Sequence, residues 1–343
     1  MRSIYDYDLK DLEQYLIDNN LKPFRAKQIF KWLYEKRVNS FDLMSDISKD
    51  LQTKLNNDFY IQTLNIKAHQ ISKDGTQKFL FELPDGCLVE SVLMVFDYGF
   101  SACVSSQVGC NMGCKFCASG LLKKQRDLTA GEIVGQALMI QRELDKQEGR
   151  LGNIVVMGTG EPFDNYDNVM KAMSIINSPY GLEIGSRHIS ISTCGVVPGI
   201  LRFANENVQY NLAISLHASN NELRSRLMPI NNAYPLEVLF DALKKYSGLN
   251  NRRLTFEYLL LKGINDKKEN AEEIKELLKG LNAYINLIPY NSVKENEFET
   301  SSEENALRFY DLLKKNGVAV TLRQKKGDDI DAACGQLRAN NLK

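Results

Sequence analysis

The sequence has no long apolar run and no excess of charge of one sign. Its densest apolar patch, at residues 258–261, is far shorter than the ~20 residues that a membrane-spanning helix needs. The first residues, MRSIYDYDLK, contain no apolar segment typical of a secretion signal, so we expect a cytoplasmic protein that is not in a membrane. The 43 basic residues balance 43 acidic ones, so the overall charge neither favours nor excludes a nucleic-acid partner.

The seven cysteines are few for 343 residues, but three of them are crowded together as Cys110, Cys114 and Cys117. Without an export signal, we expect these thiols to be in the reducing cytosol. Clustered thiols there usually bind a metal or take part in catalysis rather than form a disulfide framework.

From about residue 100, short β-rich runs alternate with longer amphipathic stretches. The β-rich runs are 101–109, 153–158, 188–193, 210–217, 253–261, 284–289 and 317–323. This alternation predicts a parallel sheet in a complete or partial β/α barrel, with a doubly wound open sheet as the alternative. In both folds reactive groups gather where strands end. The three cysteines and residues 158–162, 192–195, 215–217 and 289–291 all fall at such ends.

Residues 1–85 have a different pattern and predict a separate N-terminal accessory domain, with the catalytic domain at 86–343. Two helices joined at Lys22-Pro23 are followed by a hairpin around residues 73–75. The second helix is rich in cations. It is either a solvated face over a core of Ile29, Phe30 and Leu33, or a patch that contacts RNA. The cations are Lys22, Arg25, Lys27, Lys31, Lys36 and Arg37.

Three closely spaced cysteines are one short of a structural zinc site, which takes four protein ligands. A fourth ligand would have to be Cys103, Cys194, His188 or His217, all distant in sequence. A 4Fe–4S cluster takes one ligand per iron, so three thiolates leave one iron open for substrate. The spacing and the position at a strand end favour the cluster over zinc.

Cys110-x3-Cys114-x2-Cys117, with Phe116 before the last cysteine, resembles the radical S-adenosylmethionine (SAM) signature. Several further segments resemble the RlmN family of adenosine-C2 methyltransferases, and related Cfr enzymes, which methylate C8, share most of them. These segments are CVSSQVGCNMGCKFCASG, MGTGEPFDN, ISLHA, RSRLMPIN, NLIPYN and GDDIDAACGQL. The resemblance implies a partial (β/α)6 radical SAM barrel with a small, mainly helical N-terminal domain.

Carbon 2 of adenine is electron-poor, so direct displacement on the SAM methyl group fails there, whereas a radical can add. A thiolate can hold the methyl group first. The resemblance implies that Cys334 is this acceptor and that a second SAM, cleaved at the cluster, activates its methyl group. After addition to C2, Glu90 would remove the proton, and Cys103 would attack the Cys334 sulfur, releasing RNA and leaving a disulfide.

Each of these three residues also has a structural interpretation. Cys334 in AACG could be a small buried apolar residue, Cys103 a core residue, and Glu90 a solvent-facing strand residue. The resemblance favours the catalytic roles.

The resemblance further implies a SAM site. Gly160 and Glu161 would bind the methionine ammonium group, because glycine permits close approach and the carboxylate accepts from a cation. Other matching positions are Ser192, Ser215, Leu216, His217 and Asn291. His217 could instead be a core histidine and Asn291 a turn cap, and we expect a structural role for Cys194.

The leading hypothesis is therefore a radical SAM methyltransferase that acts on C2 of an adenosine in 23S rRNA, at the peptidyl-transferase centre, and of the adenosine next to the tRNA anticodon. It would be a monomer that uses two SAM molecules per turnover and a low-potential electron donor such as flavodoxin or ferredoxin. The alternatives are C8 methylation of the same rRNA adenosine and a zinc-stabilised RNA-binding module without chemistry.

Overall fold

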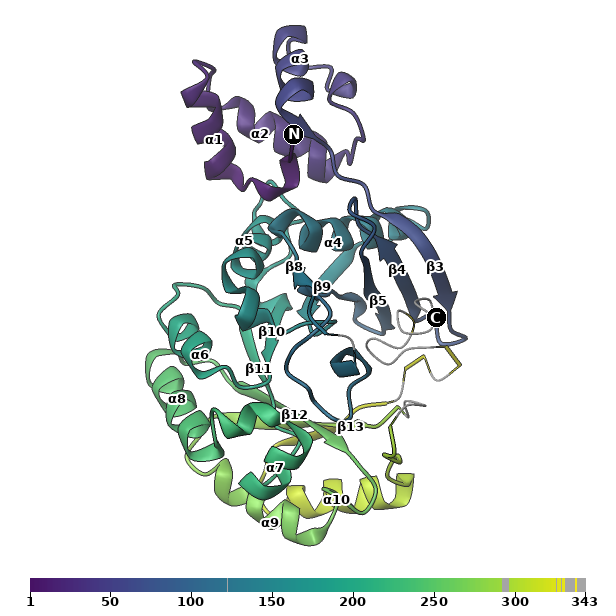
Figure 1. Ribbon diagram of the computed structural model, residues 1–343, viewed down its shortest axis with the longest axis vertical. Helices are drawn as coiled ribbons and strands as arrows, with labels where there is room; N and C mark the ends of the chain where they lie inside the picture. Colours follow the sequence, from purple (N-terminus) through teal and green to yellow (C-terminus); the bar gives the residue numbers. More distant parts are fainter. Residues whose placement is uncertain (122, 292–295, 325, 328, 331–336, 338–343) are drawn as a thin grey trace.

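The computed structural model describes residues 1–343 apart from 122, 292–295, 325, 328, 331–336 and 338–343. The described part contains a ten-stranded sheet with the strand order β14-β13-β12-β11-β10-β9-β6-β5-β4-β3 (Figure 1). None of the described helices is long and apolar enough to span a lipid bilayer.

Seven neighbouring strands of this sheet are parallel and follow one another in sequence order. They are β6 (Gly99–Cys103), β9 (Leu151–Val156), β10 (Ile189–Thr193), β11 (Asn211–Ser215), β12 (Leu254–Leu260), β13 (Ala283–Pro289) and β14 (Val320–Leu322). A doubly wound sheet reverses its strand order at a switch point. The sequential order therefore confirms the expected partial barrel and excludes the doubly wound alternative.

Helices connect successive parallel strands and lie on the outside of the curved sheet (Figure 1). They are α4 (Ala130–Asp145), α5 (Tyr166–Asn177), α6 (Val197–Ala204), α7 (Asn221–Leu227), α8 (Leu236–Leu249), α9 (Lys268–Leu277) and α10 (Glu303–Lys315). The first of these begins at a capping box in which Thr129 and Glu132 each bond the other's backbone N–H. Ser302 caps α10, where its side chain accepts from Asn305 N at 3.3 Å.

Three antiparallel strands extend the parallel sheet beyond β6. They are β5 (Leu88–Phe96), β4 (Gln77–Glu82) and β3 (Asn65–Ile71). The expected hairpin turn lies between β3 and β4, where Gly75 has a φ of +83°. Because residues 65–82 pair into the same sheet as β5, the pairing favours a domain boundary before residue 65, and the predicted one near residue 85 stays a prediction.

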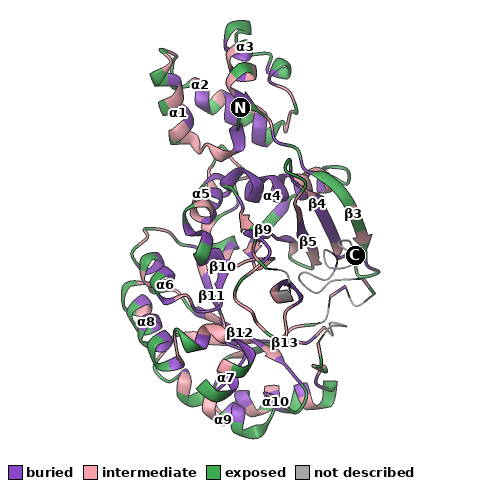
Figure 2. Cartoon of the chain, viewed as in Figure 1, coloured by how far each residue is buried: buried purple, intermediate pink, exposed green. Residues whose placement is uncertain are grey.

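The core of the sheet lies in its parallel strands. The middle residues of β11 are buried, whereas most of β3 is exposed at the edge (Figure 2). The inner strands carry apolar residues on both faces. Those on the outer face pack against the covering helices, and those on the inner face line the barrel interior. The buried wall of β10, β11 and β12 gives the polar residues at their carboxyl ends a rigid support.

The N-terminal segment forms a separate helical group at the far end of the molecule from α9 and α10 (Figure 1). Its elements are β1 (Arg2–Ser3), α1 (Leu9–Asp18), α2 (Arg25–Phe30), the π-helix Lys31–Glu35, α3 (Lys49–Asp58) and β2 (Phe59–Tyr60). Ile29, Phe30 and Leu33 are buried, as expected for the core under the cationic face. Asp6 accepts a hydrogen bond from Gly131 N at 2.7 Å, at the N-terminus of α4, where a helix favours negative charge. A bidentate pair between Arg37 and Asp145 joins the same group to the other end of α4.

Candidate active site

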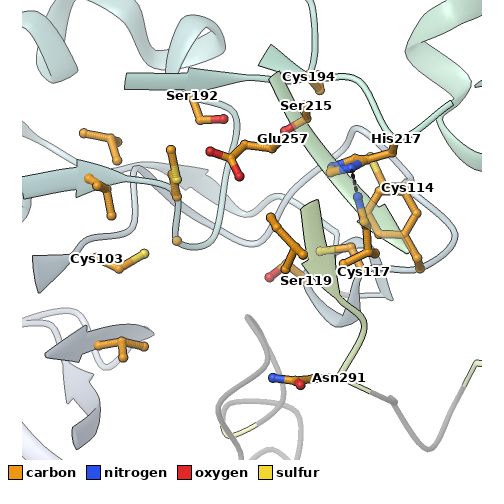
Figure 3. Close-up of a pocket in the computed structure, with 18 of the residues that line it drawn as sticks. Cys103, Cys114, Cys117, Ser119, Ser192, Cys194, Ser215, His217, Glu257 and Asn291 are labelled. Atoms are coloured by element: carbon orange, nitrogen blue, oxygen red, sulfur yellow. Dashed lines mark hydrogen bonds between the residues drawn. The ribbon is translucent and has the colours of Figure 1, made fainter. Parts of the chain in front are cut away.

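A cavity of about 650 Å³ lies inside the partial barrel, at the carboxyl ends of the parallel strands. Ten of the residues expected to function line it, and seven of them are labelled in Figure 3. The ten are Cys103, Cys110, Cys114, Cys117, Gly160, Glu161, Ser192, Ser215, His217 and Asn291. Leu216 and Glu90 are not among the lining residues, and Cys334 lies outside the described residues.

The loop that carries the three cysteines is fixed to three separate parts of the barrel. Lys115 N donates at 2.9 Å to the carbonyl oxygen of Leu227, the last residue of α7. The hydroxyl of Tyr290, after β13, donates to Phe116 O at 3.3 Å. The hydroxyls of Ser119 and Thr159 are 3.2 Å apart, which joins the loop to the turn after β9. These contacts hold the thiols at the cavity whatever they bind.

The electrostatics of the three thiols fit a cationic iron–sulfur cluster. Burial, together with repulsion from the nearby Cys117, raises the pKa of Cys110 to about 11. Burial also raises the pKa of Cys114, with added repulsion from Cys117 and Cys110. Three half-buried thiolates that repel one another need positive charge to be stable, and bound iron supplies it.

A single metal ion fits these thiols less well. Among the described residues, no three His, Cys, Asp or Glu side chains converge as ligands of one ion do. In a cluster each thiolate binds a different iron, so convergence on one point is not required.

The turn after β9 brings Glu161 into the cavity through close backbone packing. Gly160 has a φ of +115°, and a Cβ there would lie 2.6 Å from Ser106 Oγ. Glu161 is buried, and its two carboxylate oxygens accept from Phe163 N at 3.0 Å and from Cys194 N at 2.8 Å. Burial raises the pKa of Glu161, and these backbone donors oppose the rise. A ligand ammonium group at this carboxylate would lower the cost of burying its charge.

His217 closes the cavity beside the cysteine loop. Its Nδ1 accepts from Leu259 N at 3.0 Å, and its ring makes an edge contact with Phe116 at 4.8 Å between centroids. Burial, with the charge of Arg224, lowers the pKa of His217 to about 3, so the imidazole is neutral. The side chain is therefore both a satisfied buried histidine and part of the cavity wall.

The two other polar strand-end residues, Ser192 and Ser215, lie on β10 and β11, and Asn291 follows β13 (Figure 3). Leu216 is fully buried, and its N–H donates to Glu257 O at 3.0 Å. Its side chain thus supports the wall from behind rather than facing the cavity.

Cys103 and Glu90 lie on adjacent antiparallel strands. Cys103 ends β6 and faces the cavity, and burial raises the pKa of its thiol to about 11. Glu90 on β5 is only 3% exposed, and its carboxylate pairs with the fully buried Lys78 at 3.1 Å. The burial excludes the solvent-facing interpretation of Glu90. Lys78 and Glu90 are both close enough to Cys103 to influence its ionisation.

The segment leading to Cys334 is attached to the β3–β4 hairpin turn. Asp329 accepts from Ser72 Oγ at 2.5 Å and from Lys73 N at 3.1 Å. In return, Asp74 accepts from Gly327 N at 3.1 Å. We call these five residues the C-terminal clasp.

Two buried polar residues at the site did not stand out in the sequence. Arg224 on α7 is fully buried and donates to Cys194 O at 2.6 Å and to Asn231 Oδ1 at 3.1 Å, so it ties α7 to the end of β10 and to the turn at Asn231. Glu257 on β12 lines the centre of the cavity (Figure 3). A carboxylate within the apolar strand LTFEYLL was the available signal, as for Glu90.

Comparison with known proteins agrees with this geometry. The model of the ribosomal RNA large subunit methyltransferase N-terminal domain matches residues 3–61, and that of the radical SAM superfamily matches residues 104–278. A relative from Streptococcus thermophilus (strain CNRZ 1066), named probable dual-specificity RNA methyltransferase RlmN, is 55% identical over 99% of this chain and 89% of its own. The chain belongs to the RlmN family.

Further RlmN relatives and a solved structure agree. The relative from Streptococcus suis (strain 98HAH33) is 54% identical over 99% of this chain and 94% of its own. The crystal structure of a radical SAM methyltransferase from Sphaerobacter thermophilus is 42% identical, with a TM-score of 0.93 over 98% of this chain and 99% of that one. The chain is therefore a methyltransferase with the radical SAM fold, and membership of this superfamily implies that it uses SAM and a 4Fe–4S cluster.

Proposed function

We propose that this protein methylates carbon 2 of adenosine in 23S rRNA, at the peptidyl-transferase centre, and in tRNA, next to the anticodon. One observation carries the proposal: a single cavity brings together the three cysteines, Glu161 and Cys103, in a chain of the RlmN family. Adenine C2 is hidden in a helix, so the target base must be unstacked to reach this interior.

In this proposal Cys110, Cys114 and Cys117 hold the cluster, and Glu161 with Gly160, Ser192, Ser215, His217 and Asn291 holds SAM. The two groups, when bound, supply a 5′-deoxyadenosyl radical. The remaining chemistry belongs to side chains of this chain. The Cys334 thiol carries the methyl group to the base, and Glu90 accepts the C2 proton. The Cys103 thiolate then attacks the Cys334 sulfur, which breaks the bond between this sulfur and the added carbon, leaves the bonding electrons with the RNA, and forms a disulfide.

The ion pair with Lys78 suits Glu90 to this role. The Lys78 ammonium lies 3.1 Å from the Glu90 carboxylate in a buried site, where its charge offsets the cost of burying the carboxylate. The Lys78 ammonium stays beside Glu90 after Glu90 has taken up the proton, and it can then donate a hydrogen bond to another acceptor. Glu90 lies on β5, in the antiparallel extension of the sheet. Two later residues of the same strand, Val92 and Met94, line the cavity.

We also propose a cytoplasmic monomer that uses two SAM molecules per turnover and a flavodoxin- or ferredoxin-like electron donor. The N-terminal helices would contact RNA, because exposed cations lie at both ends of the π-helix: Lys31 begins it and Lys36 follows it. The division into an accessory domain at residues 1–85 and a catalytic domain at 86–343 stays a proposal, and the pairing of β3 and β4 with β5 favours a boundary nearer residue 65.

The decisive experiment uses anaerobically reconstituted protein with SAM, a reductant and either rRNA fragments or tRNA. Mass spectrometry of the digested RNA should detect 2-methyladenosine. Detection of 8-methyladenosine alone would support the C8 alternative instead. Protein that binds zinc but no iron or sulfide, and forms no 5′-deoxyadenosine, would support the RNA-binding module.

A further inference from the structure

Glu257 is a buried carboxylate aimed into the middle of the cavity (Figure 3). It is 5% exposed and lies on β12, in register with Ser215 on β11 and Asn286 on β13. Its Oε1 accepts from Asn286 Nδ2 at 3.3 Å. Its Oε2 has no hydrogen-bond donor among the described residues.

The orientation of this carboxylate is fixed by neighbouring strands. Thr321 Oγ1 on β14 donates to Asn286 Oδ1 at 2.7 Å, so the Asn286 amide presents its N–H to Glu257. Arg323 Nη1 lies 4.0 Å from Oε2, just beyond hydrogen-bond distance. Burial raises the pKa of Glu257, and Arg323 opposes the rise.

An acceptor held in place, buried and left without a donor is costly for the folded protein unless a ligand supplies the donor. Under the proposed function, two adenosines enter this cavity: that of SAM, and the target nucleotide of the RNA. Both carry a 6-amino group and ribose hydroxyls, which are the donors that Oε2 lacks. Glu257 is beside Ser215 of the expected SAM site, and Cys103, on β6, lines the same cavity.

We propose that Oε2 of Glu257 accepts a hydrogen bond from an adenosine, through its amino group or a ribose hydroxyl, and that Asn286 and Arg323 position the carboxylate. The proposal rests on the proposed function for the identity of the two adenosines. Glu257 is then a specificity residue at the centre of the site.

The test compares Glu257→Gln holoenzyme with wild type. Because Asn286 donates to one oxygen, the glutamine oxygen takes that place and its NH2 group faces the cavity, where an acceptor is needed. A matched control is Asp266→Asn, which alters a buried carboxylate that accepts from Gly263 N and Ser301 Oγ but does not line the cavity. Thermal unfolding of both variants measures any general loss of stability.

Two binding measurements separate the sources of the adenosine. If the SAM adenosine is the ligand, the dissociation constant for SAM without RNA rises about 10-fold or more in Glu257→Gln. If the target adenosine is the ligand, SAM binding is unchanged and the RNA KM rises by a similar factor. In that case, if the amino group is the donor, RNA with purine in place of the target adenine has a raised KM with wild type. With Glu257→Gln, the same change of base raises the KM no further.

Unchanged SAM binding and unchanged RNA KM in Glu257→Gln would overturn the proposal and assign Glu257 to folding alone. The Asp266→Asn control should leave both values as in wild type. Failure of the proposed function is recognised separately, because wild type would then form no 2-methyladenosine while the SAM-binding measurement still reports on Glu257.

Discussion

Gly160 shows how a single residue fixes the cavity wall. Its φ of +115° is a conformation that L side chains rarely adopt, and Ser106 and Gln107 occupy the space where a Cβ would lie. The backbone of the turn therefore approaches Ser106 and Gln107 as closely as packing permits. This approach is what places Glu161 between Phe163 N and Cys194 N.

We predict that Gly160→Ala destabilises the protein by about 1 to 3 kcal/mol and weakens SAM binding, since the turn must move. Gly86→Ala is a matched control, with a φ of +82° and no atom within 4 Å of the added Cβ. Chemical unfolding and SAM titration measure the two effects. Equal losses in both variants would show that the contacts with Ser106 and Gln107 are unimportant.

Cys103 gives a second prediction at the scale of one residue. If its thiolate releases the RNA, Cys103→Ala should still join protein to RNA but fail to separate them. Denaturing gel electrophoresis of reactions with labelled RNA should then show a covalent complex that wild type does not accumulate. Release of methylated RNA by Cys103→Ala at the wild-type rate would exclude this role.

The spacing of Cys110, Cys114 and Cys117 is visible in the sequence, because one short loop carries all three. Glu257 and Arg224 are different. Their importance depends on which face of a strand or helix lies inside the barrel, and on the carbonyl and amide groups that distant segments bring to them. Sequence alone cannot give those contacts, although a charged residue in an apolar run was a usable signal in Glu257.

At the scale of elements, the strand–helix rhythm was enough to predict the parallel strands in their order. The antiparallel extension was not predicted. Its strands β3, β4 and β5 join the parallel sheet through the pairing of β5 with β6, and the strand–helix rhythm does not indicate that pairing. The predicted hairpin at Gly75 is local and was correct. Its role in binding the distant residues 327 and 329 through the C-terminal clasp could not be read from the sequence.

We predict that the C-terminal clasp positions Cys334, because Asp329 is only a few residues before it and ~3.5 Å per residue limits how far the chain can reach. The double variant Ser72→Ala with Asp329→Ala should form 5′-deoxyadenosine normally but yield several-fold to about tenfold less methylated RNA per molecule of it. Chromatography and mass spectrometry measure the two products.

The control for the clasp is Ser40→Ala, which removes an exposed hydrogen bond from Ser40 to Asp42 in the N-terminal helices. It should leave the product ratio unchanged. A normal ratio in the double clasp variant as well would show that the clasp does not position the methyl-carrying segment.

At the scale of the whole molecule, the buried Cys103 thiol links stability to alkaline pH. Burial raises its pKa from an ordinary value near 9 to about 11. Below pH 9 both folded and unfolded thiols hold their proton, and the contribution to stability is fully present. As pH rises from 9 to 11 the unfolded thiol loses its proton first, so the free energy of unfolding falls.

We predict that wild type loses about 2 to 3 kcal/mol more than Cys103→Ala between pH 8 and pH 11. Urea unfolding with a reductant present, at several pH values, measures the difference. Parallel curves for the two proteins would contradict a raised pKa at this thiol.

The N-terminal helices give a prediction about RNA affinity. Lys31 and Lys36 are more than half exposed, so replacing both by Gln should weaken RNA binding and reduce the slope of log affinity against log salt by roughly 1 to 2. Lys268→Gln with Lys279→Gln is the control, since these lysines on the far side also pair with a neighbouring glutamate. Fluorescence anisotropy over a range of salt concentrations measures both, and equal slopes would place the RNA elsewhere.

The clasp also has a consequence for the order in which the protein matures. Gly327 and Asp329 are translated more than 250 residues after Asp74 and Ser72, the hairpin residues that receive them. The hairpin is thus synthesised before Cys334, the proposed methyl acceptor. The residues around Asp329 can therefore dock as soon as they emerge from the ribosome, onto a hairpin that is already made.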